Sequence, residues 1–316
     1  MIVTLAAAGG DSGGDTGTES DATKPRAGAA TAVAANALPP RMAADSRIHK
    51  RLFMSSPFET YGAFGCVSAA LFGLVAGSFL NVLVHRLPRG ESVVFPGSHC
   101  PACGAGILAR DNIPVVSWLL LRARCRTCGA PISARYPMLE LTNAVLWALV
   151  FLRAREWSEL LGGVFFASAC LALAAIDLEF QILPDKITLT GLAAGLFLSF
   201  FSKTRTPGSA MLGAAIGGGG LFLLAFLYER IAGHEGMGLG DVKMLAMIGA
   251  FLGPAGVLVS VLLASLSGSI VGIAAIALGR GDRKMRLPFG VFLAAGGVAA
   301  LFFADPLLAR YRALWP

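Results

Sequence analysis

The sequence has little charge. Only 14% of its 316 residues are Asp, Glu, Lys or Arg, whereas 55% are hydrophobic, and the mean hydropathy is +0.69. A soluble domain carries about 25% charged residues, so this composition excludes an ordinary soluble protein and places the chain in a bilayer. At roughly 20 residues per membrane-spanning helix, the length allows about eight helices and one small extramembrane module.

The N-terminal segment lacks large apolar side chains. Residues 1–50 are rich in Ala, Gly, Ser, Thr and Asp, a composition that cannot bury enough surface to fold. We therefore expect residues 1–60 to be disordered. No continuous apolar core follows a basic start, so a secretory signal peptide is not indicated. Met54, just before the first apolar run, is an alternative initiation site.

Apolar runs account for most of the remaining chain and predict an all-α polytopic membrane protein of about eight transmembrane helices. The runs lie at about 61–84, 138–153, 159–177, 187–202, 209–231, 242–253, 255–279 and 288–309. One bent helix could replace two short ones at Gly253-Pro254, because proline also kinks a continuous helix. We divide the chain into a first helix at 61–84, a loop module at 85–137 and a membrane core at 138–316.

Glycine is concentrated between Gly213 and Gly220. Such small residues let membrane helices approach closely. A phosphate-binding loop is not indicated, because no strand precedes these glycines and no Gly-Lys-Ser/Thr follows them.

The net charge of +7 comes mainly from short loops between apolar runs. It therefore favours a topology signal over a nucleic-acid partner. With the 85–137 loop in the cytoplasm, the loops on that face hold 14 Lys and Arg residues, against 6 on the opposite face without the N-terminal segment. This bias predicts that the loop is cytoplasmic. Arg47, Lys50 and Arg51, just before the first run, oppose it.

Two aspartates lie at the ends of apolar runs, on the predicted cytoplasmic face. They are Asp177, in Ala-Ile-Asp-Leu-Glu, and Asp241, in Gly-Met-Gly-Leu-Gly-Asp. An acid at a membrane segment is costly and therefore indicates a functional site. Two neighbouring carboxyls repel when both are ionised, so one keeps a proton and the pair can act as acid and base. The pattern predicts an intramembrane aspartyl peptidase.

Residues beside the two acids have more ordinary explanations. Asp185 is a rival acid, but it follows Pro184 at a helix start, where a capping role is preferred. Gly238 and Gly240 allow close backbone approach beside Asp241. Lys243 could lower the pKa of a carboxylate or bind a lipid phosphate.

Two further acids, Glu179 and Glu140, are expected to be interfacial charges. Glu140 is a candidate partner for loop arginines.

The loop module contains four cysteines in two Cys-x-x-Cys pairs. Cys100 and Cys103 form the first pair, and Cys125 and Cys128 follow after 21 residues. Four thiolates in this spacing predict a structural Zn²⁺ site, which would stabilise a module with little core of its own. Disulfides and a redox dithiol are the alternatives, and a reducing cytoplasm disfavours disulfides. The other two cysteines, Cys66 and Cys170, lie in apolar runs and are expected to pack there.

These motifs resemble those of the type IV prepilin peptidases, the leader peptidases and N-methyltransferases of type IV pilus and type II secretion systems. The resemblance covers about Gly77 to Ala295. It rests on Gly77-Ser-Phe-Leu-Asn81-Val-Leu-Val-His85-Arg86-Leu-Pro88, the two Cys-x-x-Cys pairs, Arg135-Tyr-Pro137 with Glu140, the segment from Asp177 to Asp185, Gly238-Leu-Gly240-Asp241 and Pro288-Phe-Gly290. Two positions depart from the family pattern, which usually has proline at Val291 and often at Thr190.

The resemblance implies that Asp177 and Asp241 are the catalytic pair. The substrate would be a prepilin or pseudopilin with a basic leader, cut at the cytoplasmic face of the bacterial inner membrane. The new N-terminal amine would then be methylated from S-adenosylmethionine. Asn81, His85 and Arg86 would contact the methyl donor or the substrate. Alternatively, Arg86 is a positive-inside anchor and His85 an interfacial polar residue.

Two other functions would also use paired membrane acids. A proton-coupled transporter should show internal repeats and acids near the midplane, whereas this sequence has no visible repeat and its acids lie at segment ends. A different Gly-x-Gly-Asp intramembrane protease would lack the cysteine loop and the motif around Asn81.

Overall fold

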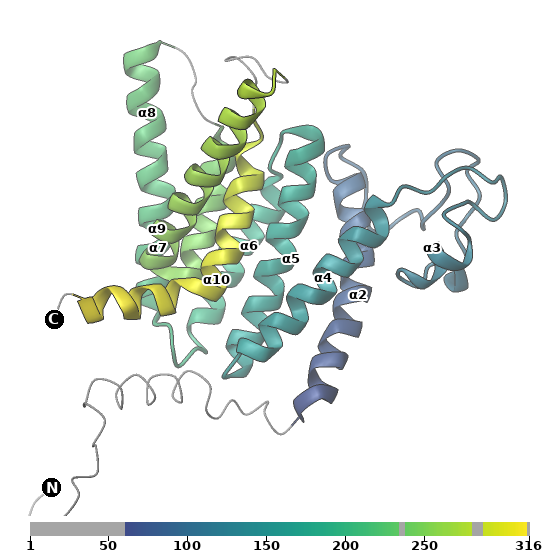
Figure 1. The fold of residues 1–316 in the computed structure, drawn as a ribbon, viewed down its shortest axis with the longest axis horizontal. Coiled ribbons are helices and arrows are strands. Elements are labelled where there is room, and N and C mark those ends of the chain that lie inside the picture. The colour runs from purple at the N-terminus through teal and green to yellow at the C-terminus, as the bar shows by residue number, and fades with distance from the viewer. Residues whose placement is uncertain (1–60, 234–237, 280–286, 315–316) are drawn as a thin grey trace, which may run out of the picture. The chain divides into compact units, whose positions relative to one another are not determined.

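The computed structural model describes residues 61–233, 238–279 and 287–314, so the predictions for residues 1–60 and Met54 lie outside the described residues. Where the chain is described, it is helical, with isolated β-bridges and no strand. The elements are α2 (Gly62–Arg86), η2 (Ala109–Asp111), α3 (Val116–Leu120), α4 (Arg135–Arg153), α5 (Trp157–Phe180), α6 (Asp185–Ser199), α7 (Pro207–Ala214), the π-helical η3 (Ala215–Gly219), α8 (Gly220–Ala232), α9 (Leu239–Ala277) and α10 (Phe289–Leu314) (Figure 1).

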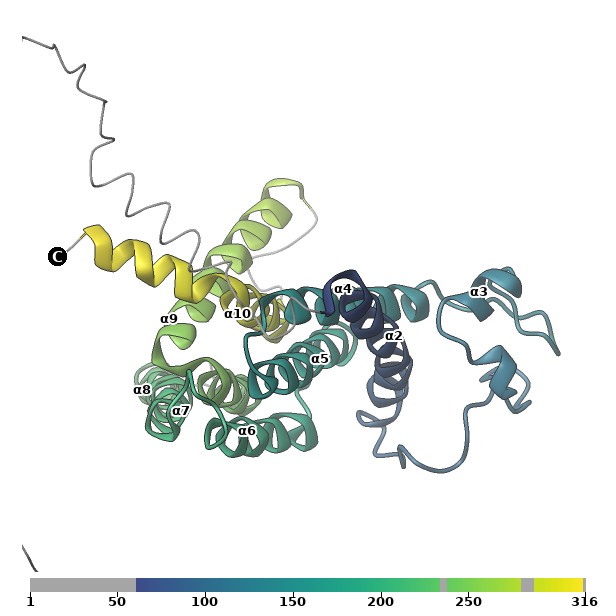
Figure 2. The same ribbon diagram turned by 90° about the horizontal axis from the view of Figure 1, so that it is seen from below.

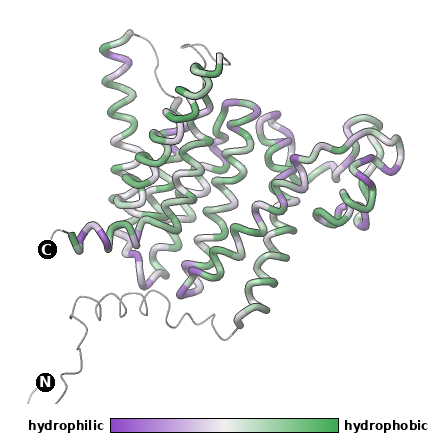
Figure 3. The backbone as a smooth tube through the Cα atoms, viewed as in Figure 1, coloured by the Kyte–Doolittle hydropathy of each residue, from purple (hydrophilic) through white to green (hydrophobic). Residues whose placement is uncertain are grey.

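Five helices among the described residues are long and apolar enough to cross a membrane: α2, α5, the continuous α7–η3–α8 rod, α9 and α10. Apolar residues dominate along these helices, and polar residues gather at their ends and in the loops (Figure 3). α4, with 19 residues, and α6, with 15, do not meet both conditions. The all-α membrane fold is therefore confirmed, but the count of eight spans is not.

The two runs predicted around Gly253-Pro254 form a single bent helix, α9. Gly253 has φ 69° and ψ −177° inside the helix, a conformation that glycine adopts without steric cost. Pro254 cannot donate the next helical hydrogen bond, so the axis changes direction there. The arm before the break is largely buried, whereas the arm after it exposes Leu258, Leu262 and Leu266.

Glycine lets α7 and α9 touch through their backbones. A Cβ added at Gly249 would lie 2.1 Å from the carbonyl oxygen of Gly213, and one at Gly213 would lie 2.3 Å from that of Gly249. At Gly217 the same atom would meet the Leu245 carbonyl oxygen at 2.5 Å. The predicted close packing of this glycine-rich segment is confirmed.

α5 packs against α2, α4, α6 and α10 and has a largely buried surface; Figure 2 shows it among these helices. Three helices are joined by a polar chain that the sequence did not reveal. The fully buried Asn143 of α4 donates to the Gly73 carbonyl of α2 at 2.8 Å and accepts from the Ser168 hydroxyl of α5 at 2.8 Å. Such bonds hold helices together where apolar contact with lipid competes.

Candidate active site and metal centre

Two carboxyl groups from different helices meet at one end of the helical unit. Asp177 lies in the last turn of α5, which ends where Gln181 turns left-handed, and Asp177 is only 5% exposed. Asp241 lies half-buried in the first turn of α9. The charge of Asp177 acts on Asp241. The two acids therefore lie close enough for the charge of one to act on the other, which is the first condition for a pair that shares a proton.

The N-terminus of α10 holds Asp177. The backbone N–H of Val291 donates to Asp177 Oδ2 at 3.0 Å, and the Gly290 backbone also bonds to this carboxyl. A Cβ at Gly290 would lie 2.8 Å from Oδ2, so only glycine lets the carboxyl approach this closely. The Pro288-Phe-Gly290 motif was noted from the sequence, but no contact with Asp177 was predicted for it.

Leu183 lies between the two glycine motifs that flank the acids. Its Cβ would be 3.0 Å from a Cβ at Gly240, and its Cδ2 would be 3.0 Å from one at Gly290. At Gly240 the close neighbour is therefore the Leu183 side chain and not the carboxyl of Asp241. At Gly238 the nearest atoms would be at 3.9 and 4.0 Å, which is ordinary contact.

The capping role predicted for Asp185 is not what the structure shows. α6 begins at Asp185 after Pro184, and no side chain caps it. Both carboxylate oxygens of Asp185 instead accept from Lys243 Nζ, at 2.7 and 2.8 Å. This half-exposed ion pair connects α6 to α9 beside Asp241. It gives Lys243 a partner and favours a structural role for Asp185 over that of a rival acid.

The other two acids differ from each other. Glu179 is partly exposed and pairs with Arg135 at the start of α4. Glu140 is not a partner of loop arginines: it is 7% exposed, and its Oε2 accepts from the backbone N–H of Val115 at 2.7 Å. A buried carboxylate needs a hydrogen-bond donor, and the Val115 amide supplies one.

The four loop cysteines come together in two similar turns. Gly104 and Gly129, each just after a pair, have φ of 69° and 72°, and their N–H groups donate to the carbonyls of Cys100 and Cys125. All four sulfurs lie within 4.8 Å of one another, and none is in a disulfide.

The separation of the sulfurs suits a metal ion. Cys100 Sγ and Cys128 Sγ are 3.8 Å apart, and a tetrahedral zinc site with bonds of about 2.3 Å places its sulfurs about 3.8 Å apart. Backbone N–H groups of Cys128 and Thr127 lower the pKa of Cys125 to about 6, whereas hydrogen bonding with Cys103 and burial raise the pKa of Cys128 to about 11, so the thiols of the cluster titrate together. The cluster could therefore hold a metal. Cys170 is fully buried and Cys66 half-buried, as expected for packing residues.

A cavity of about 470 Å³ lies between the ends of α2 and α4 and the cysteine loop. Asn81 is 5% exposed on its wall; its Nδ2 donates to the Tyr136 carbonyl at 3.2 Å, but its Oδ1 is buried without a partner. Glu140 and His85 also line the cavity. An orphaned buried acceptor beside a roomy cavity calls for a hydrogen-bond donor, which a water or a bound ligand can supply.

Arg86 also lines the cavity, but its guanidinium is engaged by backbone groups. It is 6% exposed and donates to the backbone carbonyls of Ser92, Pro96 and Gly97 at 2.9, 2.7 and 3.3 Å. Its guanidinium therefore holds the chain that leads from α2 into the cysteine loop. His85 is half-buried and contacts Arg89. It also lies on the cavity wall.

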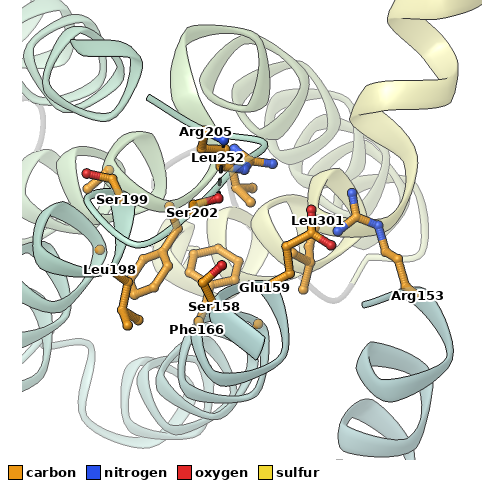
Figure 4. Close-up of a pocket in the computed structure, with 15 residues that line it drawn as sticks. Arg153, Ser158, Glu159, Phe166, Leu198, Ser199, Ser202, Arg205, Leu252 and Leu301 are labelled. Atoms are coloured by element: carbon orange, nitrogen blue, oxygen red, sulfur yellow. Dashed lines mark hydrogen bonds between the residues drawn. The ribbon is translucent and has the colours of Figure 1, made fainter. Parts of the chain in front are cut away.

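A second, small cavity of about 50 Å³ lies at the opposite end of α5 (Figure 4). Its wall includes Ser158 and Glu159 of the first turn of α5 and Arg205 of the α6–α7 turn. Nearby, Arg153 forms an ion pair with Asp305 of α10 at 2.8 Å. This cavity is separate from the acid pair and too small for a peptide, so we regard it as part of the packing.

Comparison with known proteins places this site in a family. A prepilin leader peptidase/N-methyltransferase of Burkholderia pseudomallei (strain 1026b) is 38% identical over 263 residues, which cover 75% of this chain and 85% of the relative. This chain belongs to the type IV leader peptidase family. Relatives with the same name from Aeromonas hydrophila and Pseudomonas aeruginosa are 38% and 35% identical, over 76% of this chain and 91% of each relative.

Two family models match successive parts of this type IV leader peptidase chain. Residues 71–154 match the bacterial peptidase A24 N-terminal domain, and residues 164–273 match the type IV leader peptidase family itself. The first range contains the cavity and the cysteines, and the second contains Asp177 and Asp241. No solved structure matches the chain. The resemblance drawn from the motifs is thus confirmed.

Proposed function

We propose that this chain is an intramembrane aspartyl endopeptidase that removes the leader peptide of type IV prepilins or type II secretion pseudopilins. The observation that carries the proposal is the meeting of Asp177 and Asp241 at adjoining helix ends. One ionised carboxylate takes a proton from water, whose oxygen attacks the scissile carbonyl. The protonated partner gives its proton to the leaving amine, and the carbon–nitrogen bond breaks.

The site lies at the cytoplasmic face of the bacterial inner membrane in this proposal. The Lys and Arg bias supports a cytoplasmic position for the cysteine loop. α2 and α5 both end on the side that bears this loop (Figure 1), so the acid at the end of α5 would lie on the same face. A substrate's apolar helix would then stay in the bilayer while its leader reaches the acids from the cytoplasm.

Purified protein in detergent, incubated with a prepilin and analysed by mass spectrometry, tests the peptidase. Asp177→Asn and Asp241→Asn should each abolish cleavage while leaving expression and insertion intact, because an amide cannot cycle a proton. Asp185→Asn and Asp305→Asn are matched controls that should keep measurable cleavage. Full activity of either of the first two variants would remove the assignment.

The cavity beside α2 is the proposed site for S-adenosylmethionine. The ammonium, hydroxyl and amino donors of this molecule suit the unpartnered Asn81 Oδ1 and the Glu140 carboxylate. When bound, the molecule would supply an electrophilic methyl group to the new N-terminal amine. His85 stays a proposed contact, and Arg86 is proposed to act through the loop that it holds.

Direct binding separates this proposal from cleavage. Asn81→Leu should weaken binding of radiolabelled S-adenosylmethionine to the purified protein and should leave prepilin cleaved but unmethylated. Asn112→Leu, at an amide on the same cavity wall, is a comparison variant. Unchanged binding by Asn81→Leu would place the methyl donor elsewhere.

The ion proposed at the four cysteines is zinc. A closed set of four sulfurs leaves no position for water, so the metal would stabilise the loop rather than take part in the reaction. It would thereby shape the wall of the cavity, which Cys100 and Cys125 also line.

A further inference from the structure

The two acids have unequal surroundings. Asp177 Oδ2 accepts the N–H of Val291 at 3.0 Å and lies against the Gly290 backbone. The carboxyl of Asp241 accepts no hydrogen bond from the residues that the structure describes. Because a donated N–H stabilises an ionised carboxylate more strongly than a protonated one, the pair should hold its single charge on the residue with the donors.

The donors belong to a helix N-terminus. α10 begins at Phe289, so Val291 is its third residue and its N–H has no acceptor within the helix. Asp177 thus acts as the N-terminal cap of α10, supplied by another helix. The partial positive charge of that helix end adds to the preference for a negative carboxylate.

Other charges near Asp177 do not reverse this preference. The acid on α9 is Asp241, on which the charge of Asp177 acts. Lys243 of α9 pairs with Asp185 of α6, and Arg135 of α4 pairs with Glu179. Arg89, in the turn after α2, lies over the Phe180 ring at 5.1 Å. The described charged residues of α10, namely Asp305, Arg310 and Arg312, lie toward its other end.

We infer that Asp177 is the resting base of the pair and Asp241 the resting acid, and that the Val291 N–H is the positioning group that fixes this division. The inference rests on the proposed peptidase function and adds the direction of proton flow. Water gives its proton to Asp177, and the leaving amine takes its proton from Asp241. The reverse transfer between the two acids then restores the starting state.

This chain offers a precise test, because position 291 usually carries proline in the family pattern. Val291→Pro removes the N–H, and the first turn of a helix tolerates proline since that N–H has no helical acceptor. The preceding Gly290 has no Cβ to clash with the proline ring. Val291→Ala is the matched control, because it trims the side chain and keeps the N–H.

The measurement is the pH profile of kcat/KM for prepilin cleavage. Loss of one charge-assisted hydrogen bond should move the acid limb upward by about one pH unit, so that cleavage below the limb falls about tenfold. Val291→Ala should match the unmodified protein. If Val291→Pro does not fold, the α-hydroxy analogue of valine at 291 removes the same N–H as a backbone ester.

Three results would overturn the inference: an unchanged profile without the N–H, an equal shift in Val291→Ala, or movement of the alkaline limb alone. The last would mean that Asp177 carries the resting proton. Failure of the underlying function looks different, because Asp177→Asn would then still cleave. Loss of cleavage in Asp177→Asn with an unshifted Val291→Pro profile removes only the division of roles.

Discussion

Arg86→Ala should loosen the chain that leads from α2 into the cysteine loop while leaving the membrane helices intact. The guanidinium of Arg86 donates to three loop carbonyls. Each bond contributes about 1 kcal/mol net, since water can replace part of the loss in a loop near the surface. We therefore expect the loop to open about 2–3 kcal/mol more easily, which corresponds to roughly 30- to 160-fold faster exchange of its amides.

Hydrogen–deuterium exchange by mass spectrometry measures this opening. The informative amides are Gly90 and Glu91, which donate to the carbonyls of Leu87 and Arg86. Arg89→Ala is the matched control, because Arg89 is an exposed arginine three residues on and makes no bond to the Ser92–Gly97 carbonyls. Equal exchange in the two variants would refute the clamp and return Arg86 to the role of an anchor or ligand contact.

The remaining predictions concern the metal and the helix packing. Metal analysis should find about one zinc per chain, lost in Cys103→Ser and kept in Cys66→Ser; a folded, disulfide-bonded protein free of metal would contradict this. Gly249→Ala places a Cβ 2.1 Å from the Gly213 carbonyl oxygen and should lower the free energy of unfolding by about 1–3 kcal/mol. Gly219→Ala, where nothing lies within 4 Å, should not, and equal Tm values in detergent would count against the packing argument.

Local patterns could predict the features that depend on local chemistry. Two Cys-x-x-Cys turns need only four residues each to aim two sulfurs at one point, so the cysteine cluster was predictable from spacing. Asp177 and Asp241 could be chosen as candidate functional residues because acids beside apolar runs are rare and costly. A bend in α9 could be predicted at Gly253-Pro254. Glycine can adopt a positive φ, and proline has no N–H to donate a helical hydrogen bond.

Features that depend on contact between distant segments could not be predicted. Nothing near Glu140 signals that the amide of Val115 will satisfy it. Asp185 looks like a cap because of its place after Pro184, yet its partner Lys243 comes from another helix. The donor to Asp177 is the backbone N–H of Val291. Every residue except proline has this group, so the residue type does not reveal its role.

One ion pair connects the helices that carry the proposed cleavage and methylation sites. Arg135 begins α4 one residue before Tyr136, whose carbonyl holds Asn81 on the cavity wall. Its partner Glu179 lies two residues beyond Asp177 on α5. The start of α4 therefore ties the cavity to the acid pair. In the proposed sequence of reactions, this connection would keep the methylation site close to the amine that cleavage exposes.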